Sequence, residues 1–209
     1  MSAKPGASMT EGDPAGSLLE FAHGLLGSRI VSGDVVVELT EVEAYAGPLD
    51  PASHAFTRTP RSEIMFGPPL HLYVYFSYGV HWCANIVWGE EGTAGAVLMR
   101  AGRVVSGLEV ARQRRGAAVP DQRLASGPAN LTKALGIGGT DNGADLTDAD
   151  GIHLEWGAGP IPLIVAGPRV GISKAADVPW RFWIAGDRAV SAYKRSPRAP
   201  APAVAITRR

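Results

Sequence analysis

The sequence predicts an α+β fold, a single mixed domain with a curved, mainly antiparallel sheet, a protruding β-hairpin and flanking helices. First, 209 residues with 45% apolar side chains suffice for one domain with its own core. Second, short runs of strand-forming residues are separated by frequent turn residues, among them 26 glycines and 16 prolines. Third, the connections between these runs are short, as is typical of antiparallel strands. We expect this domain to span residues 14–195, between a disordered N-terminus (1–13) and a disordered basic tail (196–209).

The first predicted elements are a helix and a long strand. Asp13-Pro14 is typical of a helix start, a cap residue followed by proline, and Gly27 ends the apolar helical pattern. A Val-rich strand follows over residues 30–45. A turn signal interrupts it at 32–34, and Gly47-Pro48 ends it.

A long connection and a hairpin come next. Residues 48–70 show no clear periodicity and contain four prolines after Pro48, and connections of this length are commonly functional. The runs 71–77 and 80–88 are predicted to form the two strands of the hairpin. A further strand is expected at 95–101.

The C-terminal half is predicted to hold two helices and four short strands. We expect the helices at 106–115 and 128–135, and the strands at 152–156, 161–165, 169–173 and 180–185. Three arginines, Arg112, Arg114 and Arg115, lie at the C-terminal end of the first helix, where they complement the helix dipole. Small residues before the second helix either leave backbone N–H groups for a phosphate or serve as an ordinary cap.

Composition points to the cytoplasm. Cys83 is the single cysteine, which excludes an internal disulfide and fits a reducing compartment. No apolar run approaches the ~20 residues of a membrane span, and the N-terminus lacks a signal-peptide pattern, so we expect no membrane association.

Charge leaves nucleic-acid binding open. The net charge is zero, but residues 1–57 carry two basic and eight acidic side chains, and residues 58–209 carry eighteen and twelve. This asymmetry permits one basic face on the folded protein. It is equally compatible with a surface on which the basic and acidic side chains mix once the chain folds.

The strand over 35–45 ends in carboxylates. Alternation places its side chains on one face in the order Val35, Val37, Leu39, Glu41, Glu43, Tyr45. An apolar face that turns acidic should either bury carboxylates or open them onto a pocket. Glu43 is the candidate for chemistry, and Glu41 is expected to be structural.

Aromatic residues gather in the predicted hairpin. Alternation places Tyr73 and Tyr75 on one face, whereas Tyr78 falls at the turn and should project. Nucleic-acid bases stack well on tyrosine and histidine, and a projecting side chain can enter a duplex where a base has left. A carboxylate that faces such a pocket can activate water.

Six segments together resemble one known family. They are Glu-Val-Glu-Ala-Tyr-Ala-Gly-Pro (41–48), Arg-Thr-Pro-Arg (58–61), Met-Phe-Gly-Pro-Pro (65–69), Tyr-Val-Tyr-Phe-Ser-Tyr-Gly (73–79), Val-Leu-Met-Arg-Ala (97–101) and Ser-Gly-Pro-Ala-Asn-Leu (126–131). The chain resembles the alkyladenine (3-methyladenine) DNA glycosylases, the single-domain type shared by mammals and bacteria, over roughly residues 17–195. The resemblance implies base-excision repair, by hydrolysis of the N-glycosidic bond of alkylated or deaminated purines such as 3-methyladenine, hypoxanthine or ethenoadenine.

The resemblance also implies catalytic and intercalating roles. Glu43 matches the residue that activates water in the family, and Arg100 matches an arginine that positions this glutamate and the water. Tyr78 matches the hairpin tyrosine that intercalates where the flipped base was.

Five further positions match the base-binding pocket of the family. Tyr45, His54 and Tyr75 match residues that sandwich the flipped base, and Asn85 matches one that excludes the amino group of guanine. Val170 lies in a segment that resembles a backbone wall of the pocket.

The expected partner is double-stranded DNA that contains damaged purines, bound by a monomer in the cytoplasm and at the nucleoid. Candidates for contacts with the DNA backbone are Arg58, Arg61, Gly127 and Lys133. No organic cofactor is expected. A metal site is not expected either, because the histidines show no His-x-x-x-His spacing and no cysteine pair is present.

Departures from the family pattern concern the loop before the hairpin. Leu70 stands where relatives usually have glycine, Ser62 replaces a frequent asparagine, and the 54–61 segment is slightly short. We expect these changes to affect the lesion range more than the reaction.

Two other function classes stay open. One is a non-catalytic nucleic-acid-binding protein that uses the same aromatic hairpin. The other is a glycoside hydrolase, which needs a second carboxylate across the pocket from Glu43.

Overall fold

The computed structural model describes residues 14–160 and 163–202. The predicted N-terminal segment 1–13 and the last residues of the predicted tail, 203–209, lie outside the described residues. The helices are α1 (Pro14–Leu25), α2 (Leu108–Arg115) and α3 (Pro128–Leu135). The strands are β1 (Arg29–Ser32), β2 (Val35–Tyr45), β3 (Leu72–Ser77), β4 (His81–Val87), β5 (Ala96–Ser106), β6 (Ala125–Ser126), β7 (His153–Glu155), β8 (Ile164–Gly167) and β9 (Arg181–Ile184). Short 3₁₀ turns lie at Gly47–Leu49, Glu63–Phe66, Asp121–Arg123 and Gly139–Asp141.

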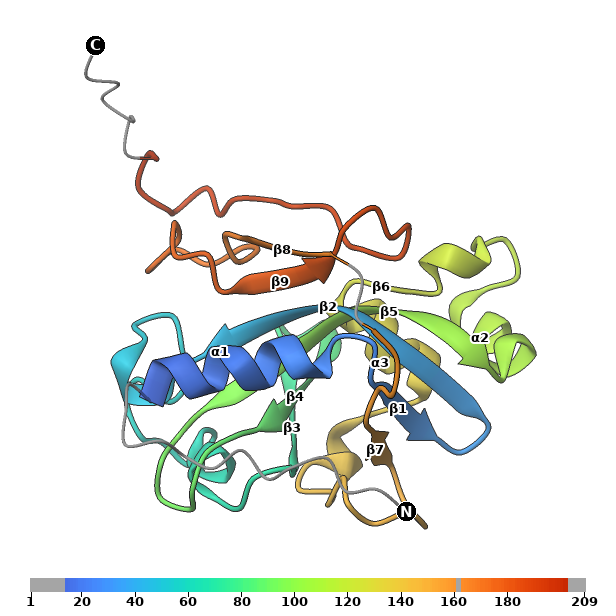
Figure 1. The fold of residues 1–209 in the computed structure, drawn as a ribbon, viewed down its shortest axis with the longest axis horizontal. Coiled ribbons are helices and arrows are strands. Elements are labelled where there is room, and N and C mark those ends of the chain that lie inside the picture. Colours follow the sequence, from blue (N-terminus) through green and yellow to red (C-terminus); the bar gives the residue numbers. More distant parts are fainter. Residues whose placement is uncertain (1–13, 161–162, 203–209) are drawn as a thin grey trace.

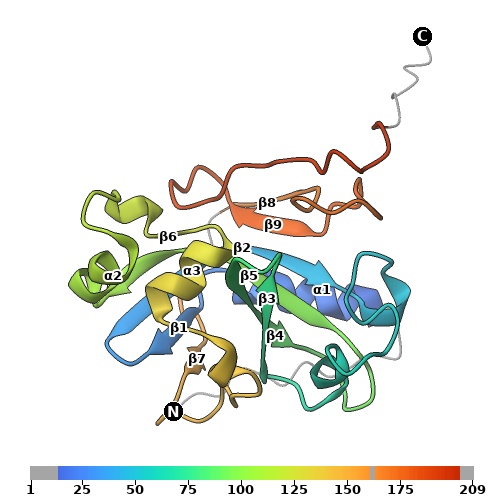
Figure 2. The ribbon, with the colours of Figure 1, turned by 180° about the vertical axis from the view of Figure 1, so that it is seen from behind.

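The sheet is antiparallel at every pairing of the described strands, with β3, β4, β5, β2, β1 and β7 in this spatial order. Strand β5 occupies one edge of β2 along its length, so β1 and β9 share the other edge. The sheet thereby curls, with β8, β9 and the C-terminal segment (residues 188–202) gathered along one side of the molecule (Figures 1 and 2). This confirms the predicted α+β domain with a curved, mainly antiparallel sheet.

Helices α1 and α3 supply much of the apolar core. Leu18 and Leu25 of α1 and Leu131 and Leu135 of α3 are fully buried and belong to one cluster with the sheet. Figure 1 is seen from the side of α1, and Figure 2 from the side of α3 and the β3–β4 hairpin. The arginines at the end of α2 have structural partners. Arg112 pairs with Glu109 and Asp121, Arg114 donates to the carbonyl of Ala134, and Arg115 donates to that of Leu124.

Two paired bulges change which face of β2 carries the carboxylates. Thr40 is an extra residue in β2, because Leu39 and Glu41 face the successive residues Gly102 and Ala101 of β5. Arg100 is an extra residue in β5 in the same way. A bulge shifts the alternation of a strand by one residue.

The expectation that the carboxylates share a face with the preceding valines is therefore wrong. Val37 and Leu39 before the bulge and Val42 and Ala44 after it all belong to the core cluster. Glu43 consequently points to the opposite side of the sheet, away from this core.

The predicted strand at 169–173 is absent. Its backbone N–H groups have other partners, since Val170 donates to the side chain of Glu43 and Gly171 to the carbonyl of Lys194. Gly171 also has a φ of 74°, which breaks an extended run. The strand expected at 161–165 lies later in the chain, at β8, and its residues 161–162 are outside the described part.

Candidate active site

A cavity of about 470 Å³ lies on the face of the sheet opposite the core. Strands β2, β3, β4 and β5, the connection between β2 and β3, and the segment after β8 all contribute to its walls. All eight predicted catalytic, pocket and intercalating residues line it, namely Glu43, Tyr45, His54, Tyr75, Tyr78, Asn85, Arg100 and Val170. Its volume is in the range of small-molecule sites and is sufficient for a purine base.

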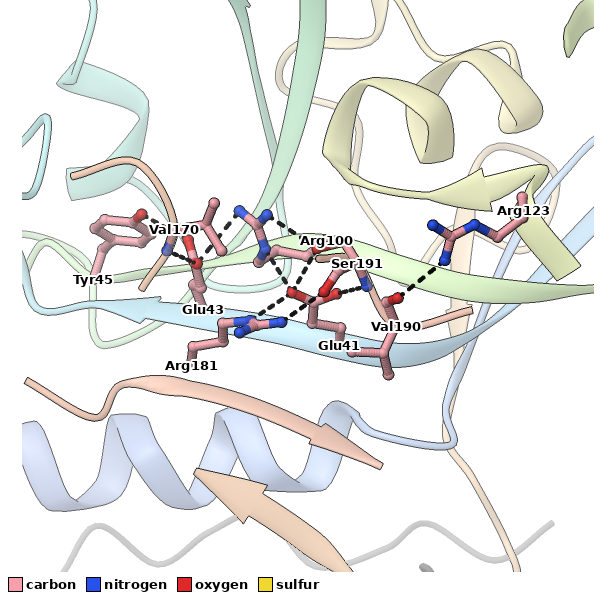
Figure 3. Close-up of polar contacts among 9 residues, drawn as sticks. All are labelled: Glu41, Glu43, Tyr45, Arg100, Arg123, Val170, Arg181, Val190 and Ser191. Atoms are coloured by element: carbon pink, nitrogen blue, oxygen red, sulfur yellow. Dashed lines mark hydrogen bonds and ion pairs between the residues drawn. The ribbon is translucent and has the colours of Figure 1, made fainter. Parts of the chain in front are cut away.

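Glu43 is fully buried in the wall of this cavity, and its carboxylate is held in place by three neighbours (Figure 3). Its Oε1 accepts the backbone N–H of Val170 at 2.7 Å, and its Oε2 accepts the hydroxyl of Tyr45 at 2.9 Å. Arg100 Nη1 lies 3.3 Å from Oε1. Since a carboxylate offers about four lone-pair sites, these contacts do not exhaust its capacity to accept hydrogen bonds.

The charge states around Glu43 follow from burial. Burial, and then the carboxylate of Glu43, raise the pKa of Tyr45 well above its ordinary value, so the hydroxyl keeps its proton and donates it. Burial alone would lower the pKa of Arg100, but Glu43 and Glu41 outweigh it, and the net effect is a raised pKa. Arg100 is therefore a permanent cation beside the candidate catalytic carboxylate.

Glu41 also binds Arg100, at Nε rather than at Nη1 (Figure 3). Its Oε1 accepts Nε of Arg100 at 2.8 Å, Nε of Arg181 at 2.7 Å and the hydroxyl of Ser191 at 2.9 Å. Its Oε2 accepts the backbone N–H of Ser191 at 2.6 Å. All the hydrogen-bonding capacity of Glu41 is thus directed at β5, β9 and the C-terminal segment, as expected for a structural residue.

Aromatic rings form another part of the cavity wall. The ring centroids of His54 and Tyr75 are 4.6 Å apart at 76°, and those of Tyr73 and Tyr75 are 5.4 Å apart. Nδ1 of His54 lies 3.0 Å from the hydroxyl of Tyr73. Desolvation of the ring by its neighbours, and then the charge of Arg61, lower the pKa of His54 to about 4. The imidazole is therefore neutral at pH 7.

Asn85 is buried in the floor of the cavity. Its Nδ2 donates to the carbonyl of Tyr73 at 3.0 Å, which fixes the amide across the β3–β4 pair. Cys83, which also lines the cavity, has a pKa raised by burial, so its thiol is protonated and behaves as an apolar wall.

Tyr78 projects from the tip of the hairpin at the cavity mouth. Its side chain is 89% exposed, and its φ of 50° lies in the left-handed region, which is unusual for a bulky residue. Gly79 follows with a φ of 68°, so both residues at the tip are left-handed. An exposed, backbone-strained aromatic residue at a cavity mouth is typical of a functional position.

Arg169 belongs to the site and is not among the predicted residues. It is 1% exposed, pairs with Asp50, donates to the carbonyl of Ala44, and stacks its guanidinium 4.7 Å from the ring of Tyr45. It thereby fixes both Tyr45 and the adjacent N–H of Val170. The resemblance places Arg169 in the segment 169–171 that lines the pocket through its backbone, but it gives no indication that its side chain pairs with Asp50.

The four DNA-backbone candidates lie in different environments. Arg61 lines the cavity and stacks 5.0 Å from the ring of Tyr75, and Gly127 caps α3 beside the cavity residue Pro128. Arg58 is paired with Glu63, and Lys133 is exposed in the last turn of α3.

The two unusual loop residues have clear structural roles. Leu70 has a φ of 60°, the left-handed conformation that glycine adopts without strain, and its side chain packs against the core. Ser62 is fully buried, and its hydroxyl accepts the N–H of Thr59 at 2.9 Å. The loop before the hairpin therefore keeps an ordered path with these residues.

Residues 14–160 and 163–202 contain no group of three or more His, Cys, Asp or Glu side chains arranged to hold a metal ion. Among the same residues, no helix has the length and apolar character needed to cross a bilayer.

A buried carboxylate in an aromatic cavity of base size, beside an exposed tyrosine hairpin, fits the class of DNA glycosylases. Residues 14–188 match the family model described as methylpurine-DNA glycosylase (MPG). The chain belongs to this family and is a monofunctional glycosylase, a hydrolase of N-glycosyl bonds that acts in DNA repair.

Bacterial relatives agree with the family assignment over most of the chain. A protein of Nocardia farcinica (strain IFM 10152) is 55% identical over 191 residues, covering 87% of this chain and 90% of its own length. One of Mycolicibacterium fortuitum is 53% identical over 188 residues, covering 87% and 96%. One of Mycobacterium leprae (strain Br4923) is 49% identical over 194 residues, covering 87% of each. All three bear the provisional name 3-methyladenine DNA glycosylase.

Proposed function

We propose that this enzyme flips alkylated or deaminated purines out of duplex DNA and hydrolyses their glycosidic bond with a water activated by Glu43. The observation that carries the proposal is the buried carboxylate of Glu43, which is held by two hydrogen bonds in a cavity with aromatic walls. The proposed substrates are 3-methyladenine, hypoxanthine and ethenoadenine.

The reaction needs few groups. Water, hydrogen-bonded to a free lone pair of Glu43, attacks C1′ of the flipped nucleotide as the bond from C1′ to the purine nitrogen breaks. The purine leaves with the electron pair of that bond, and the water proton passes to Glu43. The carboxylate also stabilises positive charge that develops on the sugar, and Arg100 keeps the carboxylate oriented.

The aromatic wall favours cationic lesions. A methyl group at N3 or N7 places positive charge on the purine, which stacks favourably on electron-rich rings. His54 is neutral at pH 7 because its pKa is about 4, so it does not repel such a base. Tyr75 likewise stays protonated, since burial raises its pKa. Asn85 in the cavity floor is proposed to exclude the amino group of guanine.

Flipping is assigned to the hairpin. Extrusion of a base costs a few kcal/mol, least for a damaged base, and stacking in the cavity returns roughly 1–3 kcal/mol per base. The exposed ring of Tyr78 at the cavity mouth fills the place that the base leaves. We propose that the enzyme acts as a monomer, in the cytoplasm and at the nucleoid.

The test is single-turnover base release from a duplex with one hypoxanthine or ethenoadenine, and 3-methyladenine release from methylated DNA. Glu43→Gln keeps the shape of the side chain and should slow release at least about 100-fold. Glu91→Gln, an exposed loop carboxylate, is the matched control and should leave release unchanged.

Binding separates the competing functions. The Glu43→Gln variant should still bind a duplex with an abasic-site analogue. Lesion binding without base release by wild-type protein on all three lesions would instead support the non-catalytic nucleic-acid-binding alternative. A glycoside hydrolase is disfavoured because Glu43 is the one acidic residue among the described residues that line the cavity.

A further inference from the structure

A second groove adjoins the cavity at the hairpin tip. It has a volume of about 320 Å³ and shares Tyr78, Val170 and Gly171 with the wall of the cavity. Its other side is formed by residues 194–198 of the C-terminal segment (residues 188–202). The groove therefore begins where a flipped nucleotide would leave the duplex.

Free positive charge faces this groove. Lys194 and Arg198 are exposed, and neither side chain has a partner among the described residues. Arg195, between them, is already neutralised by Asp177. The sequence from Arg188 to Arg209 contains six basic residues and no acidic one, so no acidic side chain in this part of the chain competes for the two cations.

The C-terminal segment is fixed where it meets the site. The backbone N–H and hydroxyl of Ser191 bind Glu41, and the carbonyl of Lys194 accepts the N–H of Gly171 at 2.9 Å. Arg195 also donates to the carbonyl of Pro200. Cations on a preorganised segment lose less entropy on binding than cations on a mobile tail.

We propose that Lys194 and Arg198 bind the DNA-backbone phosphates next to the flipped nucleotide, on the strand that carries the lesion. The two residues are at most about 14 Å apart along the chain, short enough for neighbouring phosphates of one strand. Phosphate contacts fix the register of a protein on the duplex without reading sequence. This inference rests on the proposed function, which places the lesion strand beside Tyr78; on undamaged DNA the same two cations bind the corresponding phosphates of that strand.

The experiment compares two double variants that each lose two positive charges. In Lys194→Gln/Arg198→Gln the groove is neutralised, whereas in Arg29→Gln/Arg112→Gln the charges are lost on β1 and α2. Each control arginine forms surface ion pairs that contribute little to stability. The affinity for a duplex with one abasic-site analogue is measured between 50 and 200 mM NaCl.

Each phosphate contact contributes about 0.9 to the slope of log affinity against log salt. The groove variant should therefore lose about 1.8 of this slope, so that wild-type affinity falls about tenfold more than that of the variant over the same salt range. The control should keep the wild-type slope. Equal slopes for the groove variant and wild type, or equal losses in both double variants, would overturn the proposal.

Neutral methylphosphonates at the phosphates flanking the lesion provide a second readout. They should weaken binding by wild-type protein. They should lower the affinity of the groove variant only a little further, since that variant already lacks the contacts to these phosphates. Independent, additive losses would contradict the assignment. Failure of wild-type protein to release any lesion base would reject the proposed function itself, whereas unchanged slopes with normal base release would reject only the groove.

Discussion

Tyr78 combines a bulky side chain with a backbone conformation that favours glycine. Its ring has almost no packing to lose, because it is 89% exposed, and the left-handed φ of 50° costs on the order of 1 kcal/mol. We therefore predict that Tyr78→Gly leaves the free energy of unfolding unchanged or raises it by up to about 1 kcal/mol. The same change should weaken binding to a duplex with an abasic-site analogue.

Tyr78→Ser is the companion variant, because serine removes the ring and keeps the strained backbone. Both variants should lose affinity to a similar extent, and only the glycine variant should gain stability in thermal unfolding. If Tyr78→Gly binds abasic DNA as tightly as wild type, the tyrosine does not fill the vacated position.

His54 gives a pH prediction. Its pKa is about 4 in the folded protein, against an ordinary value of 6.5, so the unfolded chain binds more protons between these two values. The stability that His54 contributes is complete above pH 6.5 and is lost as the pH falls towards 4. An NMR titration should place the midpoint of His54 near 4, so base release should show no step near pH 6.5 from this residue.

Arg61→Gln tests the cause of that shift. Desolvation is the larger cause and stays, while the charge of Arg61 is removed, so the midpoint of His54 should rise but remain below 6.5. A midpoint near 6.5 in wild-type protein would mean that the imidazole is hydrated and would remove the argument for a neutral wall.

At the scale of elements, the network around Glu41 joins β2, β5, β9 and the C-terminal segment. Glu41→Gln leaves Arg100 and Arg181, both nearly fully buried, without their shared anion. Removal of one partner from a buried ion pair costs about 3–5 kcal/mol, and we predict a loss of this size in chemical denaturation. Glu38, on the same strand, pairs with the half-exposed Arg29 and Arg103, so Glu38→Gln should cost less than about 1 kcal/mol. Equal losses in the two variants would contradict the network.

The β2 strand also shows how far sequence patterns reach. Its existence, its end at Tyr45 and the pocket role expected of Glu43 follow from the Val-rich run and the motif around it. The face of the sheet on which Glu43 lies does not follow from the sequence. The residues before Thr40 and those after it each alternate correctly between the two faces, but the bulge at Thr40 shifts this alternation by one residue. A bulge that depends on the partner strand leaves no mark in the pattern of one strand.

The prediction of a strand around Val170 was wrong for a related reason. Alternating residues predicted a strand, but the N–H groups of Val170 and Gly171 are used by Glu43 and Lys194 instead of a neighbouring strand. The pairing of Arg169 with Asp50 joins residues 119 apart in sequence, and local periodicity carries no information on such contacts. The hairpin, by contrast, was predicted closely because its strands, turn and aromatic face are all local.

At the scale of the whole molecule, the protein has no net charge yet must bind a polyanion. Phosphate contacts are the same on damaged and undamaged DNA and make binding salt-dependent. The cavity contributes stacking on aromatic rings, which does not release counterions. Varying the salt concentration should therefore change the contribution of the phosphate contacts to the affinity and leave that of the stacking unchanged.

We predict parallel salt dependences for Glu43→Gln on a hypoxanthine duplex and on the undamaged duplex of the same sequence. The ratio of the two affinities should stay constant between 50 and 200 mM NaCl, because the lesion adds stacking in the cavity but no new phosphate contact. The catalytically impaired variant is used so that the lesion survives the measurement. A ratio that shrinks steeply as salt rises would mean that lesion recognition creates additional phosphate contacts, and flat affinities on both duplexes would argue against duplex binding altogether.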